Sequence, residues 1–81
     1  MQWNRVTEKP PIEGKDYLVW TGYCMIVATA EYYNIEEMLN HYEPELVQEI
    51  TSSKGYFAEI GEKHYFDNPR VFWAELPEGP K

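Results

Sequence analysis

Residues 17–33, YLVWTGYCMIVATAEYY, decide the fold of this chain, because the run from Tyr17 to Ala30 contains no charged side chain. β-Branched and aromatic residues dominate this stretch, and such residues favour strands. Thr21-Gly22 interrupts it near the middle, as a tight turn between two strands would. We therefore predict strands at residues 17–20 and about 23–32, which together nucleate an antiparallel sheet.

The second of these strands is apolar on both of its faces, a pattern typical of a central strand. Cys24 falls within it and has no basic neighbour in the sequence that would activate its thiol, so we expect a buried structural cysteine. Because Cys24 is the single cysteine of the chain, an internal disulfide is excluded. A domain this small without disulfides indicates a reducing, cytoplasmic environment.

A two-stranded hairpin alone is not stable in water, so the other segments must cover it. We expect residues 3–8 to form a short strand or an extended arm that docks on a sheet edge, and residues 10–14 to form a rigid connector that turns at Gly14. Further strands are predicted at residues 56–60, 64–66 and 71–76, followed by a polar tail at residues 78–81. Trp73 is expected in the core, between sheet and helix.

Helical periodicity begins after Asn34, which with Glu37 resembles a capping box. Pro44 predicts either a kink or a second short helix that starts there, and Gly55 could supply the left-handed residue that ends the helix. The sequence thus predicts one α+β domain over residues 1–81, a small antiparallel sheet of four or five strands with one kinked or two short helices packed on one face. The apolar residues that follow Asn34 would cover an arc of roughly 120° on a helix. They are Ile35, Met38, Leu39, Tyr42, Leu46 and Ile50.

The charge of the chain limits its partners. Fourteen acidic residues against seven basic ones give a net charge of −7, which opposes direct binding to nucleic acid or to an anionic membrane. The uncharged run is shorter than the roughly 20 residues of a membrane-spanning helix, and the first residues lack the pattern of a signal peptide. We therefore expect a protein partner, with neither nucleic acid nor membrane as a direct ligand.

Signatures of catalysis are missing from the sequence, which has no Gly-x-Ser-x-Gly motif and no glycine-rich phosphate loop. Glu37, His41 and Glu45 recur every four residues, a spacing that can serve one metal ion, but Pro44 interrupts the helix between the last two. His64 near Asp67 is typical of an ordinary surface hydrogen bond. We predict a non-enzyme without catalytic, cofactor or metal site.

Both ends of the chain carry motifs that resemble a known family. Trp3-x-x-Val6 is followed by Pro11-x-x-Gly14 and a strand, and the chain closes with Trp73-x-x-Leu76-Pro77. This order is similar to that of a small family of phage and prophage proteins known as a domain of unknown function. The resemblance implies a phage or prophage origin and a small sheet, and it implies no chemistry.

The chain also departs from that family. Phe72 stands where many members have histidine, and Ala74-Glu75 replaces a common Met-Pro. Residues 33–54 form an apparent helical insertion, whose outward side chains are acidic and include only His41 as a cation. We predict that a basic partner binds these carboxylates, although solubilising charges on an ordinary helix would look the same. The carboxylates belong to Glu36, Glu37, Glu43, Glu45 and Glu49.

These observations predict a small cytoplasmic phage accessory protein that binds a host or phage protein, as an inhibitor of a host defence or regulatory complex. An acidic inhibitor that imitates DNA and occupies a nucleic-acid-binding enzyme is the first alternative. A structural or accessory component that self-associates into a homo-oligomer is the second.

Overall fold

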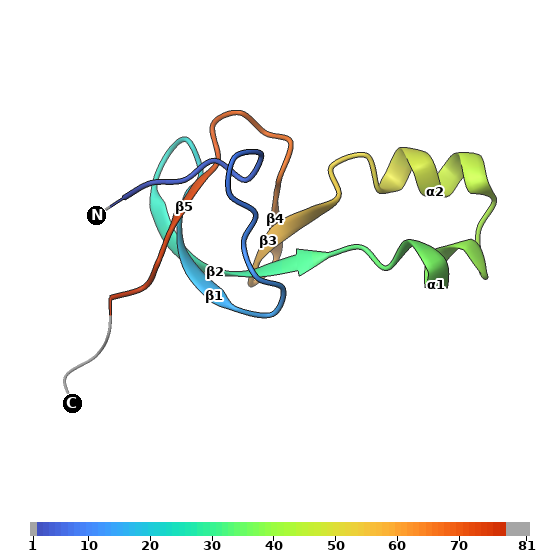
Figure 1. Ribbon diagram of the computed structural model, residues 1–81, viewed down its shortest axis with the longest axis horizontal. Coiled ribbons are helices and arrows are strands. Elements are labelled where there is room, and N and C mark those ends of the chain that lie inside the picture. The colour runs from blue at the N-terminus through green and yellow to red at the C-terminus, as the bar shows by residue number, and fades with distance from the viewer. Residues whose placement is uncertain (1, 78–81) are drawn as a thin grey trace.

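The computed structural model describes residues 2–77, and this part of the chain forms five strands and two short helices (Figure 1). The predicted α+β class with an antiparallel sheet is confirmed. The tail expected at residues 78–81 lies outside the described residues. The elements in chain order are β1 (Asp16–Trp20), β2 (Met25–Tyr32), α1 (Ile35–Leu39), α2 (Pro44–Ile50), β3 (Gly55–Glu59), β4 (Glu62–Tyr65) and β5 (Phe72–Ala74).

The strands form one sheet in the order β4-β3-β2-β1-β5, in which all neighbours are antiparallel. The uncharged stretch supplies β1 and β2, and β2 is central as predicted. The turn between them takes residues 21–24, closed by a 3.0 Å hydrogen bond from the Thr21 N–H to the Cys24 carbonyl oxygen. The expectation of a buried cysteine was therefore wrong, because Cys24 belongs to this longer turn and is exposed.

The core lies on one face of the sheet, where alternate residues of each strand point. Trp73 is 1% exposed, which confirms its predicted place in the core. Its indole packs against the Tyr17 ring with centroids 4.6 Å apart. The buried cluster consists of Tyr17, Val19, Ala28, Ala30, Phe57, Phe66, Val71 and Trp73.

The N-terminal arm, residues 2–14, covers this core. Its backbone pairs with the edge strand β5 through Asn4 and Trp73, with N···O distances of 2.7 and 2.9 Å. Two buried rings also hold it, since the Trp73 indole N–H donates to the Lys9 carbonyl oxygen at 2.9 Å and the Ile12 N–H donates to the Tyr17 phenol oxygen at 2.8 Å. The Tyr32 hydroxyl donates to the Pro11 carbonyl oxygen at 2.7 Å. The predicted docking of the arm is thus confirmed, and these bonds fix its path.

The helices lie elsewhere than predicted. The two helices contact each other, and every other substantial contact between described elements joins two neighbouring strands. Both helices therefore lie beyond the ends of β2 and β3 and do not cover a face of the sheet (Figure 1). The molecule is elongated, with extents of 47 × 27 × 25 Å. The arm, not a helix, covers Trp73, because the short connectors continue the directions of β2 and β3 instead of folding back. No helix in the described part of the chain could cross a bilayer.

Candidate interaction surface

The helical hairpin, residues 34–53, owes its geometry to two local signals. The Glu37 N–H donates to the Asn34 side-chain oxygen at 3.1 Å, which caps α1. Pro44 is the first residue of α2, where its missing N–H removes no helical hydrogen bond. The predictions of a cap at Asn34 and of a second short helix from Pro44 are both confirmed.

The base of the helical hairpin is closed by backbone and side-chain bonds. The Tyr33 N–H donates to the Lys54 carbonyl oxygen at 3.2 Å, and the Thr51 hydroxyl donates to the Val47 carbonyl oxygen at 2.7 Å. The left-handed residue is Lys54, with φ of 68°, not Gly55 as expected. Gly55 is needed for another reason, because a Cβ there would collide with the Glu31 carbonyl oxygen and the Phe66 ring.

The apolar residues of the helical hairpin remain largely in contact with solvent. Among the described helical residues, only Val47 is buried. Side chains of this size are normally buried in a domain, since each would gain about 1.5–3 kcal/mol from leaving water. Their exposed fractions are 48% for Ile35, 45% for Leu39, 51% for Tyr42, 43% for Leu46 and 38% for Ile50, and we call these five residues the apolar stripe.

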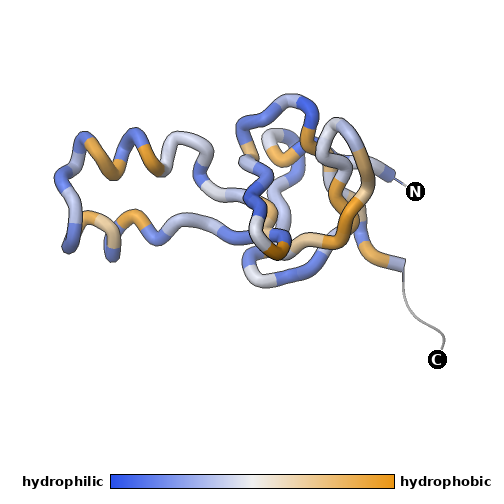
Figure 2. Tube along the Cα trace, turned by 180° about the vertical axis from the view of Figure 1, so that it is seen from behind, coloured by the Kyte–Doolittle hydropathy of each residue, from blue (hydrophilic) through white to orange (hydrophobic). Residues whose placement is uncertain are grey.

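Carboxylates flank the apolar stripe. All five glutamates predicted to bind a partner, Glu36, Glu37, Glu43, Glu45 and Glu49, are exposed. The sequence has no lysine or arginine between Lys15 and Lys54, so the helical hairpin carries no fixed positive charge of its own. Figure 2 shows hydrophobic and hydrophilic segments alternating along both helices. The element therefore presents apolar and acidic groups together.

A second apolar surface lies on the face of the sheet opposite the core. Trp3, Trp20, Met25 and Phe72 line a shallow hollow of about 400 Å³ there, and Val27 is 55% exposed. We call these five residues the open face. Sequence reasoning placed the helix over the Trp73 face and named no residues for this second face, although the apolar character of β2 on both sides already required a second cover.

Glu59, Glu62 and His64 form the group of possible metal ligands found among residues 2–77, with ligand atoms within 4.8 Å of one another. His64 Nε2 lies 3.1 Å from a Glu59 oxygen and 3.6 Å from a Glu62 oxygen. The register of β3 and β4 pairs Glu59 with Glu62, and alternation along β4 adds His64 to the same face. These three side chains could hold a cation, and the turn at Gly61 was the signal for their proximity.

The other ligand groupings considered from the sequence do not assemble. The structure gathers neither Glu37, His41 and Glu45 nor the pair His64 and Asp67 into such a group within residues 2–77. Pro44 separates the first set between two helices, and His64 turns instead toward the carboxylates of its own β-hairpin.

Comparisons with known proteins found no related protein. No family model, no curated protein sequence and no solved structure matches the chain. The resemblance of its two ends to the phage and prophage family therefore stays a prediction, and functional inference rests on the two surfaces.

Proposed function

We propose that this protein acts by binding another protein through its helical hairpin. The observation that carries the proposal is the apolar stripe, whose five large side chains are each more than a third exposed on an element that makes no substantial contact with a strand of the described sheet. The isolated helices contain five and seven residues, below the roughly 12–15 residues at which a helix becomes marginally stable in water. A partner that covers the stripe would supply the missing burial.

The partner we propose has an apolar groove bordered by lysine or arginine. Amphipathic helices are commonly bound by laying their apolar face into such a groove. The five carboxylates would then meet the basic border, which accelerates association and selects against acidic competitors. If the family resemblance holds, the partner is a host or phage protein in the cytoplasm, and binding inhibits a host defence or regulatory complex.

Imitation of DNA fits the helical hairpin less well. A surface that replaces a phosphate backbone presents charges, and its binding weakens steeply with salt. Here the carboxylates share the element with five large apolar side chains, whose contribution to binding is not screened by salt. A shallow dependence of affinity on salt favours the apolar stripe as the main contact, and a steep one favours imitation of DNA.

Self-association is a second candidate function, and the open face favours it. The five residues that define it carry no charge, and among residues 2–77 the one cation that contacts them is Arg5, whose guanidinium lies 4.7 Å from the centroid of the Phe72 ring. Sedimentation of the purified protein would show a concentration-dependent dimer that the Met25→Glu variant abolishes. A monomer at all concentrations would exclude this use of the open face.

The direct experiment captures partners from a bacterial lysate with three baits. The wild type is compared with Leu39→Ser/Leu46→Ser, which changes only the apolar stripe, and with Met25→Ser/Val27→Ser, which changes the open face. The proposal predicts a protein held by the wild type and by the open-face variant and lost from the stripe variant. Equal retention on all three baits would contradict it.

The carboxylates are tested with the captured partner once it is purified. Reversing Glu36, Glu37 and Glu43 to lysine should weaken its affinity by at least about tenfold at low salt, which corresponds to about 1.4 kcal/mol. An unchanged dissociation constant would show that the acidic groups only keep the helices soluble.

A further inference from the structure

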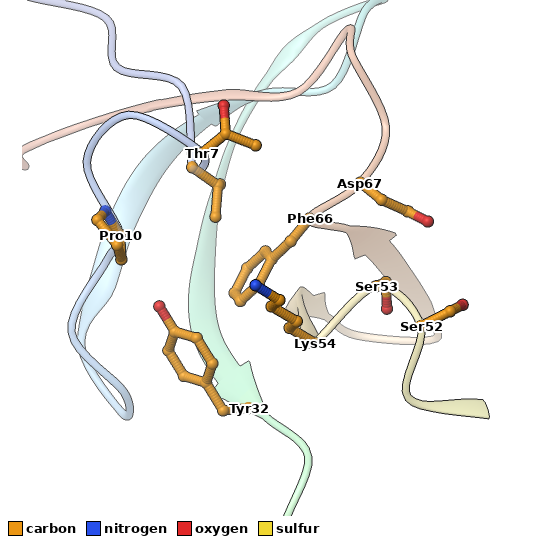
Figure 3. A pocket seen from close by; sticks show the side chains of 9 residues that line it. Thr7, Pro10, Tyr32, Ser52, Ser53, Lys54, Phe66 and Asp67 are labelled. Carbon is orange, nitrogen blue, oxygen red and sulfur yellow. The ribbon is translucent and has the colours of Figure 1, made fainter. Parts of the chain in front are cut away.

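Two hollows lie outside the helical hairpin. The first, of about 260 Å³, lies where the N-terminal arm meets the base of the hairpin, and its polar groups do not converge, since Ser53 and Lys54 lie on different sides of the Phe66 ring (Figure 3). The second, of about 490 Å³, lies at the other end of the sheet, between the turn from β1 to β2, the β-hairpin of β3 and β4, and the loop after β4. This second hollow brings three possible metal ligands together.

The three ligand side chains, Glu59, Glu62 and His64, lie on the face of the sheet that carries the core. The register of β3 and β4 pairs Phe57 with His64 and Glu59 with Glu62, and directly paired residues share a face with their second neighbours along each strand. Phe57 is 0% exposed, and the His64 side chain is 17% exposed. The core thus ends in a partly buried group of ionisable side chains, which normally requires a compensating charge or bond.

The charges of this group are not balanced within residues 2–77. Ligand oxygens of the two carboxylates lie within 4.8 Å of each other, and like charges at such a distance repel. His64 can supply at most one positive charge, and the ion pairs made by lysine or arginine in the described part of the chain include neither Glu59 nor Glu62. A divalent cation would neutralise both carboxylates at once.

The distances between the ligand atoms fit a tetrahedral zinc ion. His64 Nε2 lies 3.1 Å from a Glu59 oxygen and 3.6 Å from a Glu62 oxygen. In a tetrahedral site with bonds from zinc to nitrogen and oxygen of about 2.0–2.1 Å, neighbouring ligand atoms are about 3.3–3.4 Å apart. The Glu62 side chain is 67% exposed, so its carboxylate can rotate to complete the set. An imidazole nitrogen suits zinc, whereas calcium and magnesium take oxygen ligands.

We propose that His64 Nε2 and one carboxylate oxygen each from Glu59 and Glu62 bind Zn²⁺. A water molecule is the fourth ligand, because the site opens on the hollow of about 490 Å³, and three protein ligands with one open position are a common zinc arrangement. The proposal departs from the sequence-based expectation of no metal site. It also goes beyond the proposed partner contact, since the site contains no residue of the helical hairpin.

The test is a titration of the ¹⁵N-labelled full chain with zinc chloride, followed by calorimetry and by the imidazole and amide resonances. We expect one Zn²⁺ per chain, with a dissociation constant below about 100 µM, and shifts of the His64 Nε2 resonance and of the amides of residues 59–64. The chain has two histidines, so His41 in the helical hairpin is an internal control whose resonances should not move. Magnesium chloride at the same concentration should leave the His64 Nε2 resonance unchanged.

Variants identify the ligands, and their amide spectra show whether each one is folded. His64→Gln, Glu59→Gln and Glu62→Gln should each weaken zinc binding at least about tenfold, and the exposed position of Glu62 makes its variant the least likely to disturb the fold. His41→Gln and Cys24→Ser should bind zinc like the wild type. The proposal is overturned if the dissociation constant is above about 100 µM, if zinc shifts the His41 resonances or requires the Cys24 thiol, or if any of the three ligand variants keeps the wild-type affinity.

Discussion

The sheet with its arm and the helical hairpin bury their apolar residues to very different extents. In the sheet, Trp73 and Tyr17 are each 1% exposed and Phe57 is 0% exposed, and the polar atoms of the first two rings are bonded to the arm. In the helical hairpin, the apolar stripe remains 38–51% exposed. The comparison teaches that amphipathic periodicity identifies a face that needs a cover, and that the cover need not come from the same chain.

The difference has an energetic consequence. Removal of a side chain from the sheet core leaves a cavity that the surrounding structure cannot fill, whereas the same change on the helical hairpin removes a group that water already contacts. The sheet should therefore determine the stability of the molecule, and the helical hairpin should determine its binding.

The largest effect is expected in the core. Trp73→Ala should lower the free energy of unfolding by about 3–5 kcal/mol, a large share of the roughly 5–15 kcal/mol that small domains possess. Trp3→Ala is the matched control, because Trp3 is 38% exposed on the open face, and it should cost about 1 kcal/mol or less. Urea denaturation measures both, and a Trp73 variant with native stability would place that residue outside the core.

A smaller loss is expected at Gly55, where the helical hairpin joins the sheet. Gly55→Ala should cost about 1–3 kcal/mol, because the added methyl group collides with the backbone carbonyl oxygen of Glu31 and with the Phe66 ring. Gly61→Asn is the control, since no atom lies within 4 Å of a Cβ there and asparagine tolerates positive φ. Thermal melting of both variants checks this, and equal losses would show that the close contacts of Gly55 with Glu31 and Phe66 do not limit stability.

Tyr32 tests how the arm is held. Tyr32→Phe removes the hydrogen bond to the Pro11 carbonyl oxygen and should cost about 1 kcal/mol at neutral pH. Tyr23→Phe changes a phenol that is 82% exposed and should cost nothing measurable. Urea denaturation at neutral pH distinguishes the two variants.

The same residue gives a dependence on alkaline pH. Burial raises the pKa of the Tyr32 phenol above its ordinary value of 10.0, with smaller contributions from the negative charges of Tyr17 and Glu13. A group whose pKa is raised by folding stabilises the protein below the unfolded pKa, and this contribution disappears as the pH rises through the folded pKa. The stability difference between wild type and Tyr32→Phe should therefore shrink above about pH 10. A difference that is constant through this range would contradict the role of the buried phenol.

The smallest effects on stability are expected in the helical hairpin. Reversal of Glu36, Glu37 and Glu43 to lysine should change the free energy of unfolding by less than about 0.5 kcal/mol per residue, because all three are exposed. Thermal melting at low and high salt measures the change. A loss of several kcal/mol would show that these charges support the fold, and it would count against their proposed role in binding.

Sequence reasoning identified the elements of the sheet because their signals are local. The uncharged run from Tyr17, the turn at Gly14, the cap at Asn34 and the start of α2 at Pro44 each follow from chemistry within a few residues. All four are present in the structure, where Gly14 has φ of 80°.

The contacts between distant segments were beyond the reach of those signals. The hydrogen bond from Trp73 to Lys9 joins residues 64 positions apart, and no periodicity indicates it. The amphipathic helices could not reveal that they extend beyond the sheet, since a stripe has the same pattern whatever covers it. The cavity beside Ser53 and Lys54 likewise arises only when the arm, β2 and the residues after β4 meet.

The most direct test of the difference between sheet and helical hairpin is amide hydrogen exchange followed by NMR in the absence of a partner. The Ala30 N–H is bonded to the Lys15 carbonyl oxygen at 3.0 Å, and the Thr51 N–H is bonded to the Val47 carbonyl oxygen at 2.9 Å. If the sheet is the stable unit, Ala30 should exchange only through global unfolding, while Thr51 and the α2 amides should open at a free energy at least about 2 kcal/mol lower. Equal protection of Ala30 and Thr51 would show that the helical hairpin unfolds only together with the sheet, and would contradict this account.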